Sequence, residues 1–161
     1  MNKLLTSILL LLLFINACSL PKLGIIKETL IGEPFKLQGF YYRKTDYNSF
    51  VFYKNGVVTG GLISSPKRRN IDSLTEEWAN KERYKYNYNF VSAWGLFKVK
   101  DDSIKIRKWG HIYYDEYSVN KISGTIVNDS TLYLKYKGEN IDTFYFHYLA
   151  IKPDSTNQFI K

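Results

Sequence analysis

The chain has 161 residues, 45% of them hydrophobic, which is enough for one domain with its own core and argues against several domains. Its single cysteine excludes an internal disulfide, so the fold must rely on packing. The formal net charge of +8 favours an anionic partner, and an aromatic share of 17%, led by tyrosine, favours strands over a helical bundle.

The first residues have the pattern of a secretory signal peptide. Lys3 supplies a positive charge, and residues 4–15 form an apolar run of the length that signal peptides use. A spanning helix needs roughly 20 apolar residues, and Asn16 and Pro21 interrupt the run before that length. We therefore expect residues 1–17 to be removed, so that the mature chain begins at Cys18.

The four residues Ile15-Asn16-Ala17-Cys18 resemble the bacterial lipobox. The resemblance implies cleavage after Ala17, attachment of diacylglycerol to the Cys18 sulfur and acylation of the new amino terminus, which together anchor a chain durably in a membrane. In lipoproteins of this kind an Asp after the cysteine favours the inner membrane. Because Ser19 stands there, the resemblance implies the outer membrane, with the domain facing the periplasm. The alternative is an ordinary secreted protein with a free thiol.

Residues 18–34 are expected to form a lipidated tether, since prolines and glycines interrupt them, and residues 35–161 to form one β-domain. From Phe35 onward, strand patterns alternate with turn signals at about ten-residue spacing, which is typical of a barrel or sandwich. The first strands are predicted at residues 36–44, 49–54 and 57–63. Asn55-Gly56, between the second and third, suits a type I′ hairpin turn.

The loop predicted at residues 64–70 contains the most concentrated basic cluster of the chain, Lys67, Arg68 and Arg69. This cluster either contacts the phosphates of anionic lipids or is simply a solvated loop, and we favour the second interpretation.

The only predicted helix spans residues 71–84. Ser73 and Glu76 have the spacing of a capping box, and Ile71, Leu74 and Trp78 fall on one stripe. We expect this stripe to cover one end of the β-structure rather than to form a cofactor site.

The hairpin predicted at residues 91–109 has a register that the sequence determines. A turn centred on Asp101-Asp102 places apolar side chains on one face and polar ones on the other, whereas a slip of one residue would mix them. Facing like charges are unfavourable, so the two facing lysines should be in water. The predicted pairs are Val99 with Ile104, Phe97 with Ile106, Lys98 with Lys105, Leu96 with Arg107 and Trp94 with Trp109.

The polar face of this hairpin is a candidate contact surface. It combines a basic stripe with two tryptophans, a pairing of cations and aromatic rings that protein interfaces often use. Alternatively, the tryptophans fill the end of the barrel, and we favour that alternative. The surface consists of Trp94, Lys98, Lys105, Arg107 and Trp109.

The last strands continue the pattern. A loop at residues 128–130 places Ile126 opposite Leu132, Gly124 opposite Leu134 and Ile122 opposite Tyr136. A final strand at residues 143–151 then places Phe146 against Leu134 and Phe144 against Tyr136. The sequence thus predicts a mainly β fold, an antiparallel up-and-down barrel or curled meander of about eight strands, with one helix between strands three and four.

The arrangement resembles uncharacterised small bacterial lipoproteins of the lipocalin-like (calycin-type) β-barrel kind. That resemblance implies a fold more than an activity. It rests on the lipobox and on Gly39-Phe40-Tyr41-Tyr42, Tyr53-Lys54-Asn55-Gly56, Trp94-Gly95-Leu96-Phe97, residues 104–109 and Lys152-Pro153-Asp154-Ser155-Thr156-Asn157.

Nothing in the sequence predicts a catalytic site, a cofactor or a metal. His111 and His147 are the only histidines, neither lies in a ligand-spaced motif, and no phosphate loop or nucleophile elbow is present. Asp115 and Glu116 would serve a carbohydrate-active enzyme only if they converged with another titratable group. We therefore expect a protein that is not an enzyme.

The expected function is an interaction or accessory role of a lipid-anchored envelope lipoprotein. Its partners would be the membrane, through the anchor, and another envelope protein. A secreted, lipidated chain rarely meets nucleic acid, so nucleic acid is not expected. The alternative is a lipocalin-like carrier of a small apolar ligand, although the bulky side chains predicted to point inward favour a filled barrel.

Overall fold

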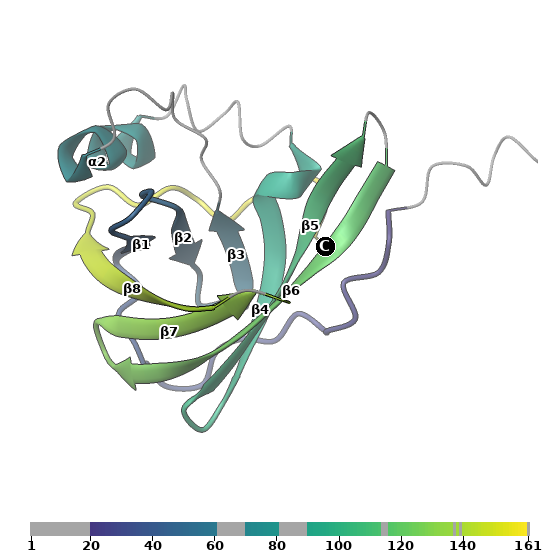
Figure 1. Cartoon of the computed structure of the whole chain (residues 1–161), viewed down its shortest axis with the longest axis horizontal. Coiled ribbons are helices and arrows are strands. Elements are labelled where there is room, and N and C mark those ends of the chain that lie inside the picture. Colours follow the sequence, from purple (N-terminus) through teal and green to yellow (C-terminus); the bar gives the residue numbers. More distant parts are fainter. Residues whose placement is uncertain are drawn as a thin grey trace, which may run out of the picture.

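A computed structural model of the chain describes residues 20–60, 70–80, 90–113, 116–136, 138 and 140–160. In this part of the chain, eight antiparallel strands form a closed barrel (Figure 1). Each strand pairs with its neighbours in sequence, and β8 closes the barrel by pairing with β1. The prediction of an up-and-down barrel with a helix between the third and fourth strands is confirmed.

The elements have the following bounds: β1 Gly39–Arg43, β2 Ser49–Phe52, β3 Val57–Gly60, helix α2 Ile71–Ala79, a 3₁₀ turn η1 Val91–Ala93, β4 Trp94–Lys100, β5 Ser103–Tyr113, β6 Glu116–Asn128, β7 Thr131–Tyr136 and β8 Ile141–Tyr148.

Two of the predicted hairpin registers are confirmed. In the β4–β5 hairpin, Lys98 faces Lys105, and Asp101 takes the positive φ of 54° that the tight turn needs. In the β6–β7 hairpin, Gly124 faces Leu134 as predicted. The other confirmed pairs are Val99 with Ile104, Phe97 with Ile106, Leu96 with Arg107, Ile126 with Leu132 and Ile122 with Tyr136.

The predicted register of the last strand is wrong. Leu134 faces Asp142, four residues earlier than the predicted Phe146, and Leu132 faces Phe144. The cause is a shorter connection after β7: Gly138 has a φ of +84°, which lets the chain turn so that β8 already begins at Ile141. Because the shift is an even number of residues, Phe144 still points into the barrel.

The barrel interior is filled with side chains. Most members of the interior cluster expose between 0% and 2% of their surface, so they are closely packed. Phe35, which precedes β1, enters this core and packs against the rings of Tyr41, Phe52 and Phe97, with centroids 5.7, 5.2 and 6.0 Å away. The interior cluster consists of Phe35, Tyr41, Phe50, Phe52, Val58, Phe97, Ile104, Ile106, Ile122, Ile126, Leu132, Leu134 and Phe144.

A second apolar layer lies on the outside of β1–β5. Strand neighbours point to opposite faces, so Phe40 points outward where Tyr41 points inward. Helix α2 covers part of this layer: Trp78 stacks on Phe40 at 6.4 Å and its indole N–H donates to the Ser49 hydroxyl at 3.1 Å. The outer cluster consists of Leu23, Phe40, Val51, Tyr53, Val57, Leu74, Trp78, Val91, Trp94, Leu96, Trp109 and Leu149.

Helix α2 begins at Ile71 as predicted, but its N-cap lies three residues before the predicted cap, Ser73. Asn70 is the N-cap: its side chain accepts from the Ser73 amide at 2.8 Å, and the Ser73 hydroxyl accepts from the Asn70 amide at 3.2 Å. The capping box therefore joins Asn70 to Ser73 instead of Ser73 to Glu76. Residues 81–84 of the predicted helix lie outside the described residues. No helix in the described ranges is long and apolar enough to cross a membrane.

Both terminal segments pack against the outer layer. The carbonyl of Pro21 accepts from the Trp109 indole at 2.8 Å, Leu23 is buried, and Glu28 pairs with Lys98 at 2.9 Å. Residues 20–34, expected to be a tether, therefore belong to the packed domain. The C-terminal segment, yellow in Figure 1, passes β1 to β3, where Asn55 donates to Ser155 at 3.0 Å.

Candidate interaction surface

Four basic side chains project from the outer face of β5, β6 and β7, and we call them the basic face. They are outward because their strand neighbours, such as Ile122 and Leu134, lie in the interior cluster. The register brings them together, since Arg107 faces Lys121, while Ser123 lies between Lys105 on one side and Lys135 on the other. The basic face consists of Lys105, Arg107, Lys121 and Lys135.

No carboxylate neutralises this face among the described residues. Glu116, at the far end of β6, is the only acidic residue within β4, β5, β6 and β7. None of the ion pairs formed by described residues includes any member of the basic face. Like charges directly opposite each other destabilise a sheet, so the Arg107–Lys121 pair carries a cost in stability.

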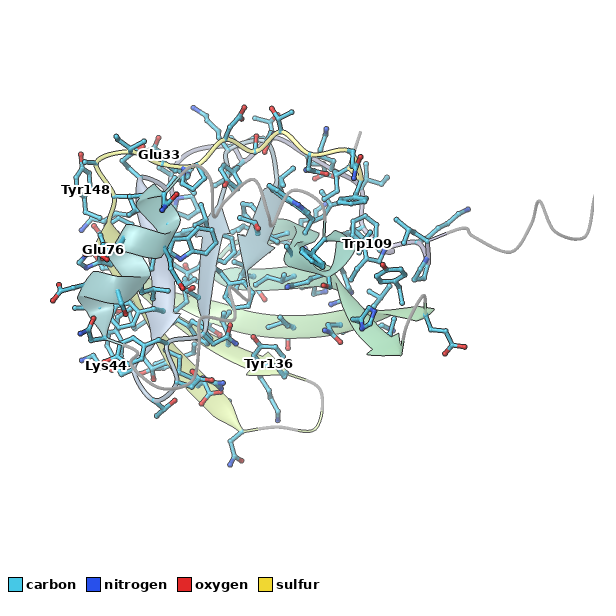
Figure 2. All side chains as sticks on the ribbon, turned by 90° about the horizontal axis from the view of Figure 1, so that it is seen from above. Glu33, Lys44, Glu76, Trp109, Tyr136 and Tyr148 are labelled. Carbon is cyan, nitrogen blue, oxygen red and sulfur yellow. The ribbon has the colours of Figure 1, made fainter. Side chains whose placement is uncertain are left out.

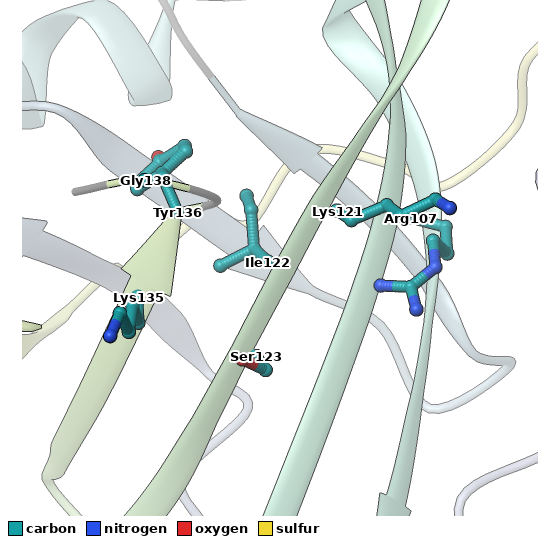
Figure 3. Close-up of a pocket in the computed structure, with 7 residues that line it drawn as sticks. All are labelled: Arg107, Lys121, Ile122, Ser123, Lys135, Tyr136 and Gly138. Atoms are coloured by element: carbon teal, nitrogen blue, oxygen red, sulfur yellow. The ribbon is translucent and has the colours of Figure 1, made fainter.

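The basic face is open to solvent. Lys105, Lys121 and Lys135 are exposed, while Arg107 is half-buried and its guanidinium donates to the Ile106 carbonyl at 3.1 Å. An open hollow of about 260 Å³ lies at this face, between β6 and the end of β7, with Ser123 in its lining. Figure 3 shows the charged ends of Arg107 and Lys121 on one side of β6 and that of Lys135 on the other.

The predicted contact surface is only partly exposed. Lys98, Lys105 and Arg107 point outward as predicted, but Trp94 and Trp109 expose 0% and 6% of their surface. The prediction of an exposed tryptophan pair is therefore wrong. The favoured alternative, in which both fill the barrel end, is also wrong, because both belong to the outer cluster. Their apolar rings face outward and are covered by other segments, which alternation along the strands could not reveal.

Lys98 differs from the basic face although it lies opposite Lys105. Its ammonium binds both carboxylate oxygens of Glu28, at 3.0 and 2.9 Å. This ion pair links β4 to the N-terminal segment, so Lys98 is engaged within the molecule.

Two further lysines are held by backbone carbonyls. Lys108, at an inward position of β5, donates to the carbonyls of Gly60 at 2.8 Å and Ser92 at 2.5 Å, and burial lowers its pKa to about 8. Lys152 donates to the carbonyls of Leu37 and Phe52, and burial also lowers its pKa to about 8. Each ammonium group therefore links two segments that are distant in sequence, which is a structural role.

A second hollow is an open groove of about 610 Å³ beside β1 and β8. Glu33, Lys36, Lys54 and Lys152 line it together with Leu37, Gln38, Phe146 and Tyr148. Its charges are largely satisfied within the chain, because Lys36 pairs with Asp129 at 3.2 Å and Lys152 binds carbonyls. The groove therefore has mixed polarity and lacks the enclosed apolar walls of a typical small-molecule site.

The other residues singled out in the sequence add no chemical site. No three His, Cys, Asp or Glu side chains come together within the described ranges. His111 packs on Tyr117 with ring centroids 5.6 Å apart, and His147 on Phe40 at 5.1 Å. Cys18, the cluster Lys67, Arg68 and Arg69, and Asp115 lie outside the described residues.

Sequence reasoning missed Lys121, Lys135 and Lys108. For Lys135 the signal was present: the predicted pairing of Ile122 with Tyr136 also implies Ser123 opposite Lys135. Lys121 required the β5–β6 register, which no short turn motif indicates. Lys108 alternates with Ile106 and is inward by the same rule, so a buried lysine could have been predicted there.

Comparisons of the chain with family models, with curated proteins and with solved structures give no match. The architecture by itself is compatible with a lipocalin-like ligand carrier, because an eight-stranded barrel can hold one small ligand.

Proposed function

We propose that this chain is a lipid-anchored, non-enzymatic interaction domain that faces the periplasm from the outer membrane and acts through its outer surface. The observation that carries this proposal is the filled interior. An eight-stranded barrel is either packed with side chains or hollow enough for one ligand. In this barrel the interior cluster is packed, and Phe35 adds a ring from outside the strands.

The filled interior argues against the carrier alternative. Small-molecule sites enclose roughly 300–1,000 Å³ and are mainly apolar. The side chains that would line such a cavity, including Ile104, Leu134 and Phe144, are 0% exposed. A carrier would need these residues to move apart, whereas an interaction domain uses the barrel as a rigid support for its surface.

The lipid anchor is supported by the signal pattern and by the lipobox resemblance at Ile15-Asn16-Ala17-Cys18. Since Leu20 already packs against the outer cluster, only Ser19 separates Cys18 from the described domain. Two residues span at most ~7 Å. An acylated Cys18 would therefore hold the barrel against the membrane surface instead of on a long tether.

Fractionation of cells that express the parent chain and a Cys18→Ala variant tests the proposal. The parent should sediment with outer-membrane lipids and carry acyl groups on Cys18, whereas the variant should keep residues 1–17 and carry no acyl group. Mass spectrometry of small molecules released from the purified parent provides the second measurement. An apolar compound released at one molecule per chain would contradict the interaction role and support a carrier. Removal of residues 1–17 from the variant as from the parent would contradict the anchor.

A further inference from the structure

We propose that the basic face docks flat on the anionic phosphate headgroups of the membrane that holds the anchor. The inference rests on the proposed lipid anchor and adds the surface, the partner and the orientation of the barrel. Its four supports are the position at which the chain leaves the domain, the unneutralised charge of the face, its polar composition and the lack of a covering segment among the described residues.

The anchor point lies beside the basic face. Lys105, Arg107 and Trp109 are alternate residues of β5, so they point to the same side of the sheet at intervals of about 7 Å. The Trp109 indole fixes Pro21 by its hydrogen bond of 2.8 Å. Cys18 precedes Pro21 by three residues and so lies within about 11 Å of it. Acyl chains on Cys18 would enter the bilayer next to Arg107.

The charge of the face is not neutralised by the described residues. Arg107 faces Lys121 with no carboxylate among the described residues to separate them. Lys98, by contrast, has Glu28, and Lys36 has Asp129, so this chain does neutralise lysines elsewhere on its surface. Lipid phosphates at the bilayer surface would neutralise the basic face, and each basic residue near an anionic surface raises the partition coefficient about fivefold.

The composition of the face favours a membrane over a protein partner. Its centre is Ser123, an exposed small polar residue flanked by Lys105 and Lys135. Stable protein interfaces have an apolar or aromatic centre with charges at the rim, whereas the centre of the basic face is polar. A layer of headgroups needs no such centre, because the acyl anchor already supplies the apolar energy.

The termini leave this face uncovered. Residues 20–28 run from Trp109 to Lys98 along the outside of β5 and β4, and the C-terminal segment contacts Leu37, Phe52 and Asn55. The side chains of Lys105, Lys121 and Lys135 remain exposed beyond them. In the part of the chain that the structure describes, no segment would have to move for the barrel to lie on its β5–β7 side.

The test uses the lipidated full protein reconstituted in two kinds of vesicle, phosphatidylcholine alone and phosphatidylcholine with one third phosphatidylglycerol. Zwitterionic vesicles report the anchor alone, and anionic vesicles report the basic face. The readout is the rate of lysine acetylation at each position, followed by mass spectrometry. Lys105, Lys121 and Lys135 should be protected in anionic vesicles only, high salt should remove the protection, and Lys54 should react equally in both.

The matched variants separate docking from net charge. Arg107→Gln with Lys121→Gln removes two charges from the face, and the protection of Lys135 should fall about 25-fold if each charge contributes about fivefold. Lys44→Gln with Lys54→Gln removes the same charge elsewhere and should leave protection unchanged. Figure 2 shows Lys44 on the opposite side of the barrel from Trp109. Thermal unfolding of both variants verifies that each is folded.

The outcomes distinguish the two proposals. Failure of the protein to associate with either vesicle would overturn the lipid anchor and therefore the proposed function. Association with both vesicles and equal acetylation in both would overturn the docking while leaving the anchor intact. Protection that appears only after addition of an acidic envelope protein would overturn the membrane as the partner of this face.

Discussion

Replacing Phe35 by alanine tests the filled interior on which the proposed function depends. Phe35 is 1% exposed and packs on three rings from β1, β2 and β4, each within 6.0 Å between centroids. Truncation of a buried phenylalanine costs about 3–5 kcal/mol through lost burial and the cavity left behind. A domain of this size has about 5–15 kcal/mol of stability. Phe35→Ala should therefore remove at least about a fifth of it.

Urea unfolding followed by tryptophan fluorescence measures this loss. With a slope of about 1–3 kcal/mol per molar urea, the midpoint should fall by at least about 1 M while the slope stays constant. Ile31→Ala is the matched control in the same segment, because Ile31 is 96% exposed, and its effect should stay within about 0.5 kcal/mol. A loss below about 1 kcal/mol for Phe35→Ala would refute the argument. Benzene bound equally by parent and variant would refute it independently, since only the variant should have an apolar cavity.

Three further predictions concern the surface, a buried amine and the helix. Lys121→Glu should stabilise the barrel by about 0.5–2 kcal/mol, because it replaces a like-charge pair with Arg107 by an opposite one; an unchanged melting temperature would count against the facing geometry. Burial lowers the pKa of Lys108 to about 8, so the unfolded state binds more protons above pH 8, and stability should rise from pH 8 towards 10. Lys108→Met should reduce that rise in chemical denaturation and leave the part due to Lys152, whose pKa is lowered in the same way. Asn70→Ala should cost about 1 kcal/mol through the lost N-cap, and Asn70→Ser should restore most of it.

The hairpin registers were predictable because two independent constraints agree in each of them. Short turns, such as the one at Asp101-Asp102, limit the register to a few choices, and the alternation of apolar side chains selects one. The last strand lacked the first constraint. Gly138 was not recognised as a turn residue. Alternation alone therefore predicted which face of the sheet Phe144 occupies, but it could not distinguish between pairing partners on β7 that differ by an even number of residues.

The terminal segments were not predictable from local pattern. Residues 20–34 carry glycines and prolines and show no periodicity, so they have the composition of a tether. Their packing depends on partners distant in sequence, such as Trp109 for Pro21 and the interior rings for Phe35. An isolated hydrophobic residue in an irregular segment gives no indication of which part of the fold will bury it. Trp94 and Trp109 were misplaced for the same reason, because the local pattern does not show which segments cover them.

Only half of the basic face could be predicted from the sequence. Lys105 and Arg107 lie on the hairpin whose register was derived, whereas Lys121 and Lys135 join them through the long β5–β6 pairing and its continuation to β7. A surface that crosses three strands is the product of several registers, so an error or a gap in one of them conceals part of it. Candidate sites on barrels are best sought after all registers are combined.

The outer surface has a part that other segments cover and a part that the described segments leave open, and the proposed docking requires this division. Outward-facing Phe40, Val51 and Trp94 would expose a large apolar area, so α2 and both termini must cover them for the barrel to remain folded. The β5–β7 side exposes the basic face together with Val127 and Tyr133, so it has less apolar surface to cover. The N-terminal segment that covers Trp109 therefore lies next to the basic face. In this arrangement the same contact, Trp109 with Pro21, completes the outer layer and sets the distance between a lipidated Cys18 and the cations that would meet the headgroups. Trp109→Phe removes this hydrogen bond, so it should make the orientation of the anchored barrel more variable and leave the association with the membrane unchanged.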